Sequence, residues 1–299
     1  MLFNSVSYVL FLPLCVIGYY LIRDKYKNLF LLAASYYFYM CWMPRYALLI
    51  GCSTLVTWLA AFVIDRVDGA GKRKLALALS VVINLGILFV FKYFNFFAGL
   101  LERIPGMSRS LPRVGLLLPV GISFYTFQAL GYAIDVYRGK NGKEGVRHER
   151  NLINYALFVS FFPQLVAGPI ERSANLLPQF RQKHRFSQEE TVKGLRLILV
   201  GMFKKVVIAD MLAMFVDKVF SDYSPWSGPI LLLAVFFFTV QIYCDFSGYS
   251  DIARGSAQIF GFRLMKNFSA PYLSVSVKEF WNRWHISLST WFRDYIYIP

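Results

Sequence analysis

The sequence predicts an all-α fold, a polytopic transmembrane protein whose residues 1–299 form one membrane-embedded domain. Of its 299 residues, 57% are hydrophobic and only 16% are charged. Soluble domains are roughly 45–50% apolar and about 25% charged. Apolar runs also follow one another with only short polar gaps. Together these observations exclude a disordered chain, a collagen-like chain and an ordinary soluble enzyme.

The basic residues lie mainly in those short gaps. The net charge is +15, and clusters occupy residues 23–27, 66–74 and 138–150. Loops that flank membrane helices and meet anionic headgroups have this pattern. The sequence therefore predicts contact with membrane lipid and no nucleic-acid partner.

Residues 1–22 are uncharged and are followed by a basic flank. A signal peptide would begin with basic residues and end at a small-residue cleavage site. The run therefore predicts a retained first helix, with Pro13 as a possible kink. A bilayer core requires about 20 helical residues. The other uncharged runs that meet this length are 46–64, 75–91, 114–134, 152–170 and 224–244.

Two further segments depart from a simple span. Residues 29–44 are short and end at Pro44 and Arg45, which predicts a tilted, partial or re-entrant helix. Residues 194–217 are apolar but place four charged side chains on one helical face, with Lys205 outside it. Such a helix lies in the interface or lines a wet interior, and we favour the interior.

Orientation follows from the lysines and arginines. With the N-terminus outside, the inner loops 23–28, 65–74 and 138–151 carry 12 basic residues and the outer segments carry 8. Because cytoplasmic loops are enriched in Lys and Arg, we expect loops 65–74 and 138–151 to be cytoplasmic.

Common catalytic and cofactor motifs are absent from the sequence. It contains no P-loop, dinucleotide, zinc-protease or serine-hydrolase signature. We therefore expect no bound metal or nucleotide cofactor. All four cysteines lie in apolar runs, and none is in a C-x-x-C, which predicts buried free thiols. His148 and His184 lie in charged loops and are expected to be solvated.

Polar residues concentrate after residue 240. Asp245, Tyr249 and Asp251 follow a long apolar run. Polar groups are costly in a membrane and therefore mark functional positions. The segment is either a polar bend that lines a cavity or a helix end at the interface, with Asp251 capping the next helix. Spacing leaves both interpretations open.

A helix over residues 279–295 is predicted next. Ser276 and Glu279 form a capping-box pattern at its start. Trp281, His285 and Ser289 are spaced by four residues and would share one face. Desolvation keeps a histidine neutral, as a general base for an alcohol requires. The alternatives are a histidine that only bonds a neighbouring helix and tryptophans that form an interfacial belt.

Five blocks resemble a known family. Residues 279–298 (EFWNRWHISLSTWFRDYIYI) and 245–251 (DFSGYSD) resemble signatures of the membrane-bound O-acyltransferase family. Residues 118–125 (LPVGISFY), 161–170 (FFPQLVAGPI) and 3–5 (FNS) resemble its bacterial alginate O-acetyltransferase branch. The resemblance implies a multi-helix fold with a membrane tunnel. It also implies transfer of an acetyl or other acyl group to a hydroxyl of an exported or cell-envelope polysaccharide.

The resemblance also implies the other participants. The donor would be an acyl thioester such as acetyl-CoA, used as a substrate rather than as a bound cofactor. The acceptor would be reached with the help of an extracytoplasmic partner acetyltransferase. The protein would be a multi-pass component of the inner or plasma membrane.

His285 matches one of two hallmark histidines of the family and is the expected catalytic residue. The other belongs to a Trp-His-Gly sequence, which does not occur here. We therefore expect a C-terminally incomplete member that is inactive by itself. The residues expected to shape the substrate-binding cavity are Asp245, Tyr249, Asp251, Arg283 and Arg293.

Two alternatives remain open. One is D-alanyl transfer to teichoic acid by the same family. The other is a polysaccharide export channel or transporter without bond chemistry. A transporter of that kind is expected to show repeats with matching broken helices, and the sequence shows no such repeat.

Overall fold

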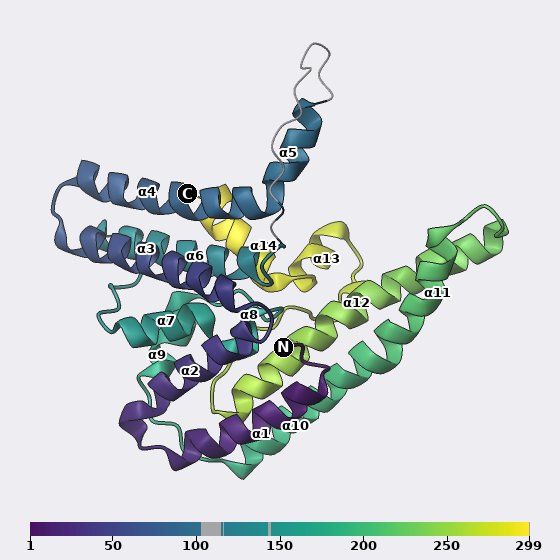
Figure 1. Cartoon of the computed structure of the whole chain (residues 1–299), viewed down its shortest axis with the longest axis horizontal. Helices are drawn as coiled ribbons and strands as arrows, with labels where there is room; N and C mark the ends of the chain where they lie inside the picture. The colour runs from purple at the N-terminus through teal and green to yellow at the C-terminus, as the bar shows by residue number, and fades with distance from the viewer. Residues whose placement is uncertain (103–114, 116, 143–144, 299) are drawn as a thin grey trace. The chain divides into compact units, whose positions relative to one another are not determined.

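The computed structural model describes residues 1–102, 115, 117–142 and 145–298, and the regular elements among them are all helical (Figure 1). The all-α prediction is therefore confirmed. The described chain divides into two compact units, each assembled from separate stretches. The first unit contains Met1–Ala34, Phe162–Glu171 and Gln182–Pro299; the second contains Ser35–Phe161 and Arg172–Arg181.

The second unit is built around helix α3 (Ala47–Arg66), which packs against α4 (Ala70–Leu88) and α6 (Ile122–Lys140). Two long apolar segments of this unit, Pro44–Arg66 and Ala70–Leu101, are long enough to cross a membrane. They confirm the expected spans at 46–64 and 75–91. The second of them continues from α4 through a π-helical turn into α5 (Phe94–Leu101).

Two expected spans are shorter or broken. The helix expected over 114–134 begins only at Ile122, since Pro119 and the left-handed Gly121 (φ +74°) precede it; residue 114 lies outside the described residues. The span expected over 152–170 is instead α7 (Leu152–Ser160) followed by the short α8 (Phe162–Leu165). Pro163 cannot donate to the helical ladder at this point, which favours the break.

The first unit contains the long helix α12 (Gly228–Ile259) and a helical stretch beside it (Figure 1). That stretch is α10 (Gln188–Met202), a π-helical turn (Phe203–Ala209) and α11 (Asp210–Ser221). Helix α12 has 32 residues and is the third segment long enough to span a membrane in the part of the chain described. It contains the expected span 224–244 but does not stop there. Both interpretations of residues 241–251, a bend and a helix end, are therefore wrong.

Glycines allow α10 and α12 to approach closely. A Cβ atom on Gly201 would lie 2.6 Å from the carbonyl oxygen of Gly248, and one on Gly194 would lie 2.7 Å from that of Gly255. Gly194 and Gly201 are seven residues apart on α10, and Gly248 and Gly255 are seven residues apart on α12. The two contacts therefore lie along one line between the helices. Small residues let helix backbones approach in this way in membranes.

The first two helices are short. Helix α1 (Val6–Leu21) runs through Pro13 without a break, and α2 (Lys27–Met40) has only 14 residues. At 1.5 Å per residue, α1 is about 24 Å long, less than the roughly 30 Å of a bilayer core. The prediction of a short second helix is confirmed.

The cysteine prediction is half right. Cys15 and Cys244 are buried, whereas Cys41 and Cys52 are exposed on the protein surface. An apolar run in a membrane protein supplies lipid-facing positions as well as core positions, so membership of such a run does not by itself bury a thiol inside the protein.

Candidate active site

His285 lies in a break between two short helices. Helix α13 (Val277–Arg283) ends before it and α14 (Ile286–Phe292) begins after it, so the single helix expected over 279–295 is wrong. His285 itself is left-handed, with φ +42° and ψ +53°. This conformation costs a non-glycine residue about 1–2 kcal/mol and must be held by its surroundings. The break also means that the predicted shared face of Trp281, His285 and Ser289 does not form.

Asn267 holds the residues that follow His285. Its carbonyl oxygen accepts the Ile286 N–H at 2.9 Å, and its Oδ1 accepts the Ser287 hydroxyl at 2.6 Å. Its amide Nδ2 donates to Ser250 Oγ at 2.9 Å, and Ser287 Oγ in turn accepts the Ile170 N–H at 3.0 Å. Asn267, Ser250 and Ser287 are at most 2% exposed. A buried and satisfied network of this kind rigidifies its surroundings.

The imidazole of His285 lies edge-on to Phe246 of α12, with ring centroids 4.6 Å apart. The side chain is partly buried, and this burial lowers its pKa from 6.5 to about 4. Desolvation disfavours the imidazolium, so the ring is neutral at pH 7. A neutral imidazole can accept a proton from a hydroxyl.

Three of the expected binding residues lie on α12 and face the α10–α11 stretch. Lys205 Nζ lies 2.6 Å from both Asp210 Oδ1 and Asp245 Oδ1, and 5.4 Å from the ring centre of Tyr249. Lys204 Nζ lies 2.7 Å from Asp251 Oδ2. Within the polar face predicted at 194–217, Lys204 and Asp210 therefore lie in the polar contacts beside α12, whereas Arg196 and Asp217 are exposed. Lys205 joins that face because the π-helical turn departs from the 100° spacing assumed for a regular helix.

The other two expected binding residues, Arg283 and Arg293, pair with different carboxylates. Arg283 pairs with Glu279, with Nη2 and Oε1 2.5 Å apart, and Arg293 Nε donates to Asp294 Oδ1 at 2.8 Å. Arg293 is also 59% exposed. The structure therefore brings together Asp245 and Tyr249, places Asp251 nearby, and gives both arginines separate partners.

The capping prediction at Ser276 is confirmed in its first half. The Glu279 N–H donates to Ser276 Oγ at 3.1 Å. The carboxylate of Glu279 accepts a bond from the N–H of Val275 at 2.9 Å, one residue earlier than the Ser276 N–H that a capping box requires.

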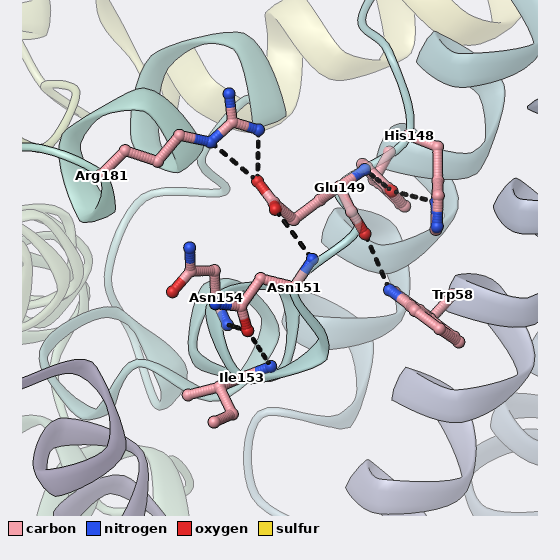
Figure 2. A network of polar contacts seen from close by, with 8 residues as sticks. Trp58, His148, Glu149, Asn151, Ile153, Asn154 and Arg181 are labelled. Carbon is pink, nitrogen blue, oxygen red and sulfur yellow. Dashed lines mark hydrogen bonds and ion pairs between the residues drawn. The ribbon is translucent and has the colours of Figure 1, made fainter. Parts of the chain in front are cut away.

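The prediction that His148 and His184 are solvated is wrong for His148. That side chain is 8% exposed and packs against the rings of Trp58 and Phe62. Its Nδ1 shares a hydrogen bond of 3.0 Å with the Tyr132 hydroxyl (Figure 2). Burial lowers its pKa below the usual value. His184 is partly buried, with its ring 4.4 Å from that of Phe262. Charged neighbours in sequence did not reveal these aromatic partners.

Sequence reasoning missed Asn267, Ser250 and Ser287 as supports of His285. Asn267 lies between Lys266 and Phe268, in a stretch whose local sequence carries no sign of these long-range bonds. It also missed the partners of the α12 carboxylates, because Lys204 and Lys205 lie about 40 residues earlier in the chain.

Comparison with known proteins identifies similar chains. The protein is 44% identical over its whole length to the probable alginate O-acetylase AlgI of Pseudomonas aeruginosa, of which the match covers 57%. It is 33% identical over its whole length to the peptidoglycan O-acetyltransferase of Helicobacter pylori, of which 62% is covered. A teichoic acid D-alanyltransferase of Streptococcus thermophilus is 30% identical over 61% of this chain and 44% of its own.

The chain thus spans less than two thirds of the length of these relatives. Residues 140–299 match the model of the membrane-bound O-acyltransferase family. Together with the long apolar helices, this match makes the molecule a membrane protein. The chain belongs to the membrane-bound O-acyltransferase family.

Proposed function

We propose that this protein transfers an acetyl group from a thioester donor, such as acetyl-CoA, to a hydroxyl of an exported or cell-envelope polysaccharide. The observation that carries the proposal is the geometry of His285, a neutral imidazole presented from a left-handed turn that Asn267 and Ser287 hold. The names of the relatives, alginate O-acetylase and peptidoglycan O-acetyltransferase, support acetyl as the group and polysaccharide as the acceptor.

In the proposed reaction the acceptor oxygen attacks the carbonyl carbon of the thioester. His285 takes the hydroxyl proton as the carbon–oxygen bond forms. The carbon–sulfur bond then breaks, and the proton passes from His285 to the departing thiolate. A positioned general base of this kind contributes about 10²–10⁴-fold to the rate.

The residues around Lys205 would form the polar wall beside this chemistry. Lys205 holds Asp245 of α12 in place and lies near the ring of Tyr249, and Lys204 holds Asp251. The three α12 positions are therefore ordered before any substrate arrives. Polar groups that are already oriented stabilise developing charge without a cost of reorganisation during the reaction. In this proposal Asp245, Tyr249 and Asp251 bind substrate, while Arg283 and Arg293 bind it from separate positions beside Glu279 and Asp294.

The proposed setting is the inner or plasma membrane, with an extracytoplasmic partner acetyltransferase that passes the group to the polysaccharide. No bound cofactor is required, because the thioester is consumed as a substrate. D-alanyl transfer is the second candidate of the same family. It is less favoured because the teichoic acid enzyme matches only 61% of the chain at 30% identity.

A gene deletion in the native host separates the candidates. The readouts are O-acetyl esters on the exported polymer, alanyl esters on the envelope, and the amount of polymer exported. Loss of acetyl esters with unchanged export is expected. Loss of alanyl esters alone would indicate the D-alanyl branch, and loss of export with unchanged acetylation of the residual polymer would indicate a channel. Either of these two results contradicts the proposal.

A further inference from the structure

The loop that follows α6 is clamped to its unit at several points (Figure 2). Trp58 Nε1 donates to the carbonyl oxygen of Glu149 at 2.8 Å, and the Glu149 N–H donates to the Tyr132 hydroxyl at 2.8 Å. The carboxylate of Glu149 accepts the Arg181 guanidinium, whose Nε lies 3.0 Å away, and the Asn151 N–H at 3.0 Å. Glu149 is only 4% exposed. The loop backbone is therefore fixed in place.

This clamp sets the direction of the neighbouring side chains. His148 and Glu149 are buried, whereas Arg147 and Arg150 on either side of them are exposed. These two arginines, together with Lys140 and Arg181, line a cavity of about 920 Å³. Ligand sites in proteins usually measure about 300–1,000 Å³, so the cavity is large enough for a small molecule or a headgroup.

The cavity is positively charged. Its acidic members are Asp65 and Glu149, and the charge of Glu149 is balanced by Arg181. Lys140 Nζ also lies 4.0 Å from Asp68 Oδ1. Arg147 and Arg150 are then the cavity's excess positive charge, opposite Asp65. The enrichment of Lys and Arg in cytoplasmic loops, which sets the orientation of a membrane protein, requires positive charge but no fixed loop structure. A loop clamped by a buried carboxylate, an indole and a tyrosine around a cavity is more ordered than that rule requires.

We propose that this cavity binds a phosphate-bearing ligand, with Arg147 and Arg150 as the principal contacts. The planar guanidinium offers two parallel donors that match the oxygens of a phosphate, and the charge of two guanidinium groups balances that of a phosphate dianion. The phosphate belongs to a soluble molecule or to the headgroup of an anionic lipid, and both share this chemistry. The cavity lies wholly within the second unit. The proposal does not depend on acyl transfer.

Binding is tested on the full chain in phosphatidylcholine nanodiscs, with thermal unfolding as the readout. Inorganic pyrophosphate is the soluble probe, and replacing part of the lipid with phosphatidylglycerol is the headgroup probe. A ligand that binds the folded state raises the unfolding temperature in a concentration-dependent way. We expect at least one probe to do so, and the responsive probe identifies the source of the phosphate.

The variant Arg147→Ala/Arg150→Ala should lower the affinity for the responding probe by about tenfold or more, because hydrogen bonds to charged groups contribute more to binding than neutral ones. The matched control is Lys183→Ala/Arg185→Ala, which removes the same charge from an exposed loop of the other unit and should keep the wild-type response. Circular dichroism checks that both variants retain their helices. The proposal is overturned if neither probe stabilises the wild type, or if both variants lose the response equally.

Discussion

The hydroxyl of Ser287 donates to Oδ1 of Asn267 at 2.6 Å, and neither side chain is more than 1% exposed. The bond ties the first turn of α14 to the segment that precedes α13, on the two sides of His285. The unusual backbone of His285 is therefore supported from a distance in sequence rather than by its own helix.

Asn267→Ala tests this support. The change leaves the hydroxyls of Ser287 and Ser250 without their amide partner, and each buried unsatisfied group costs about 1–3 kcal/mol. We expect a clear drop in the unfolding temperature in detergent and a fall in acetyl transfer. Asn141→Ala, at an exposed helix end, is the control. Wild-type stability of Asn267→Ala would show that the network does not hold the turn.

Gly201→Ala tests the close approach of α10 and α12. The new Cβ would lie 2.6 Å from the Gly248 carbonyl oxygen and 2.8 Å from a side-chain carbon of Ile252, so the helices must separate. Overpacking of this kind typically costs about 1–3 kcal/mol. Gly86→Ala is the matched control, because no atom lies within 4 Å of its added methyl and alanine favours a helix by about 1 kcal/mol. Equal unfolding temperatures for the two variants would contradict this close approach.

The two loops expected to be cytoplasmic are joined by a hydrogen bond. Arg73 Nη1 donates to the Lys140 carbonyl oxygen at 3.4 Å, so loops 65–74 and 138–151 lie at the same end of their unit. Ala70→Cys and Asn141→Cys, each in a cysteine-free background, should therefore behave alike. We expect an impermeant thiol reagent to label both only after the cells are opened. Labelling of both in intact cells would reverse the orientation, and labelling of one alone would contradict the shared end.

The pH profile of acetyl transfer depends on His285. The neutral imidazole is the active form, and burial lowers its pKa from 6.5 to about 4, so protonation removes activity only at low pH. We expect titration of the His285 imidazole to leave kcat/KM unchanged from pH 8 down to about pH 5. Phe246→Ala should expose the ring and move the acid limb of the profile upward, towards 6.5. A wild-type midpoint already near 6.5 would show that burial does not control the group.

Composition and apolar runs were sufficient to predict the helical class and the three long apolar helices. They failed where a long-range partner decides the local structure. The acids of α12 looked like a helix end because their lysines, Lys204 and Lys205, lie far away in sequence and are aligned by a π-helical turn. Helical spacing at 279–295 concealed a break, because the bonds from Asn267 outweigh the local preference for helix.

The candidate site was predicted in part. His285, Asp245 and Tyr249 could be selected because polar groups in an apolar chain are costly. The pairing of Arg283 with Glu279 follows the i,i+4 spacing of a helix, and Asp294 is the next residue after Arg293, so both pairs could have been predicted from the sequence. The burial of His148 depends on Trp58 and Tyr132, two residues from other helices that no local pattern connects to it.

His285→Ala in the native host is the most direct test of the proposed chemistry, with O-acetyl esters on the exported polysaccharide as the readout. The matched control is His184→Ala, which removes a partly buried histidine that packs against Phe262. With equal protein levels in the membrane, we expect an initial rate of acetylation about 10²–10⁴-fold lower for His285→Ala and near the wild-type rate for His184→Ala. Undiminished acetylation by His285→Ala would contradict the proposed chemistry and leave His285 as a packing partner of Phe246.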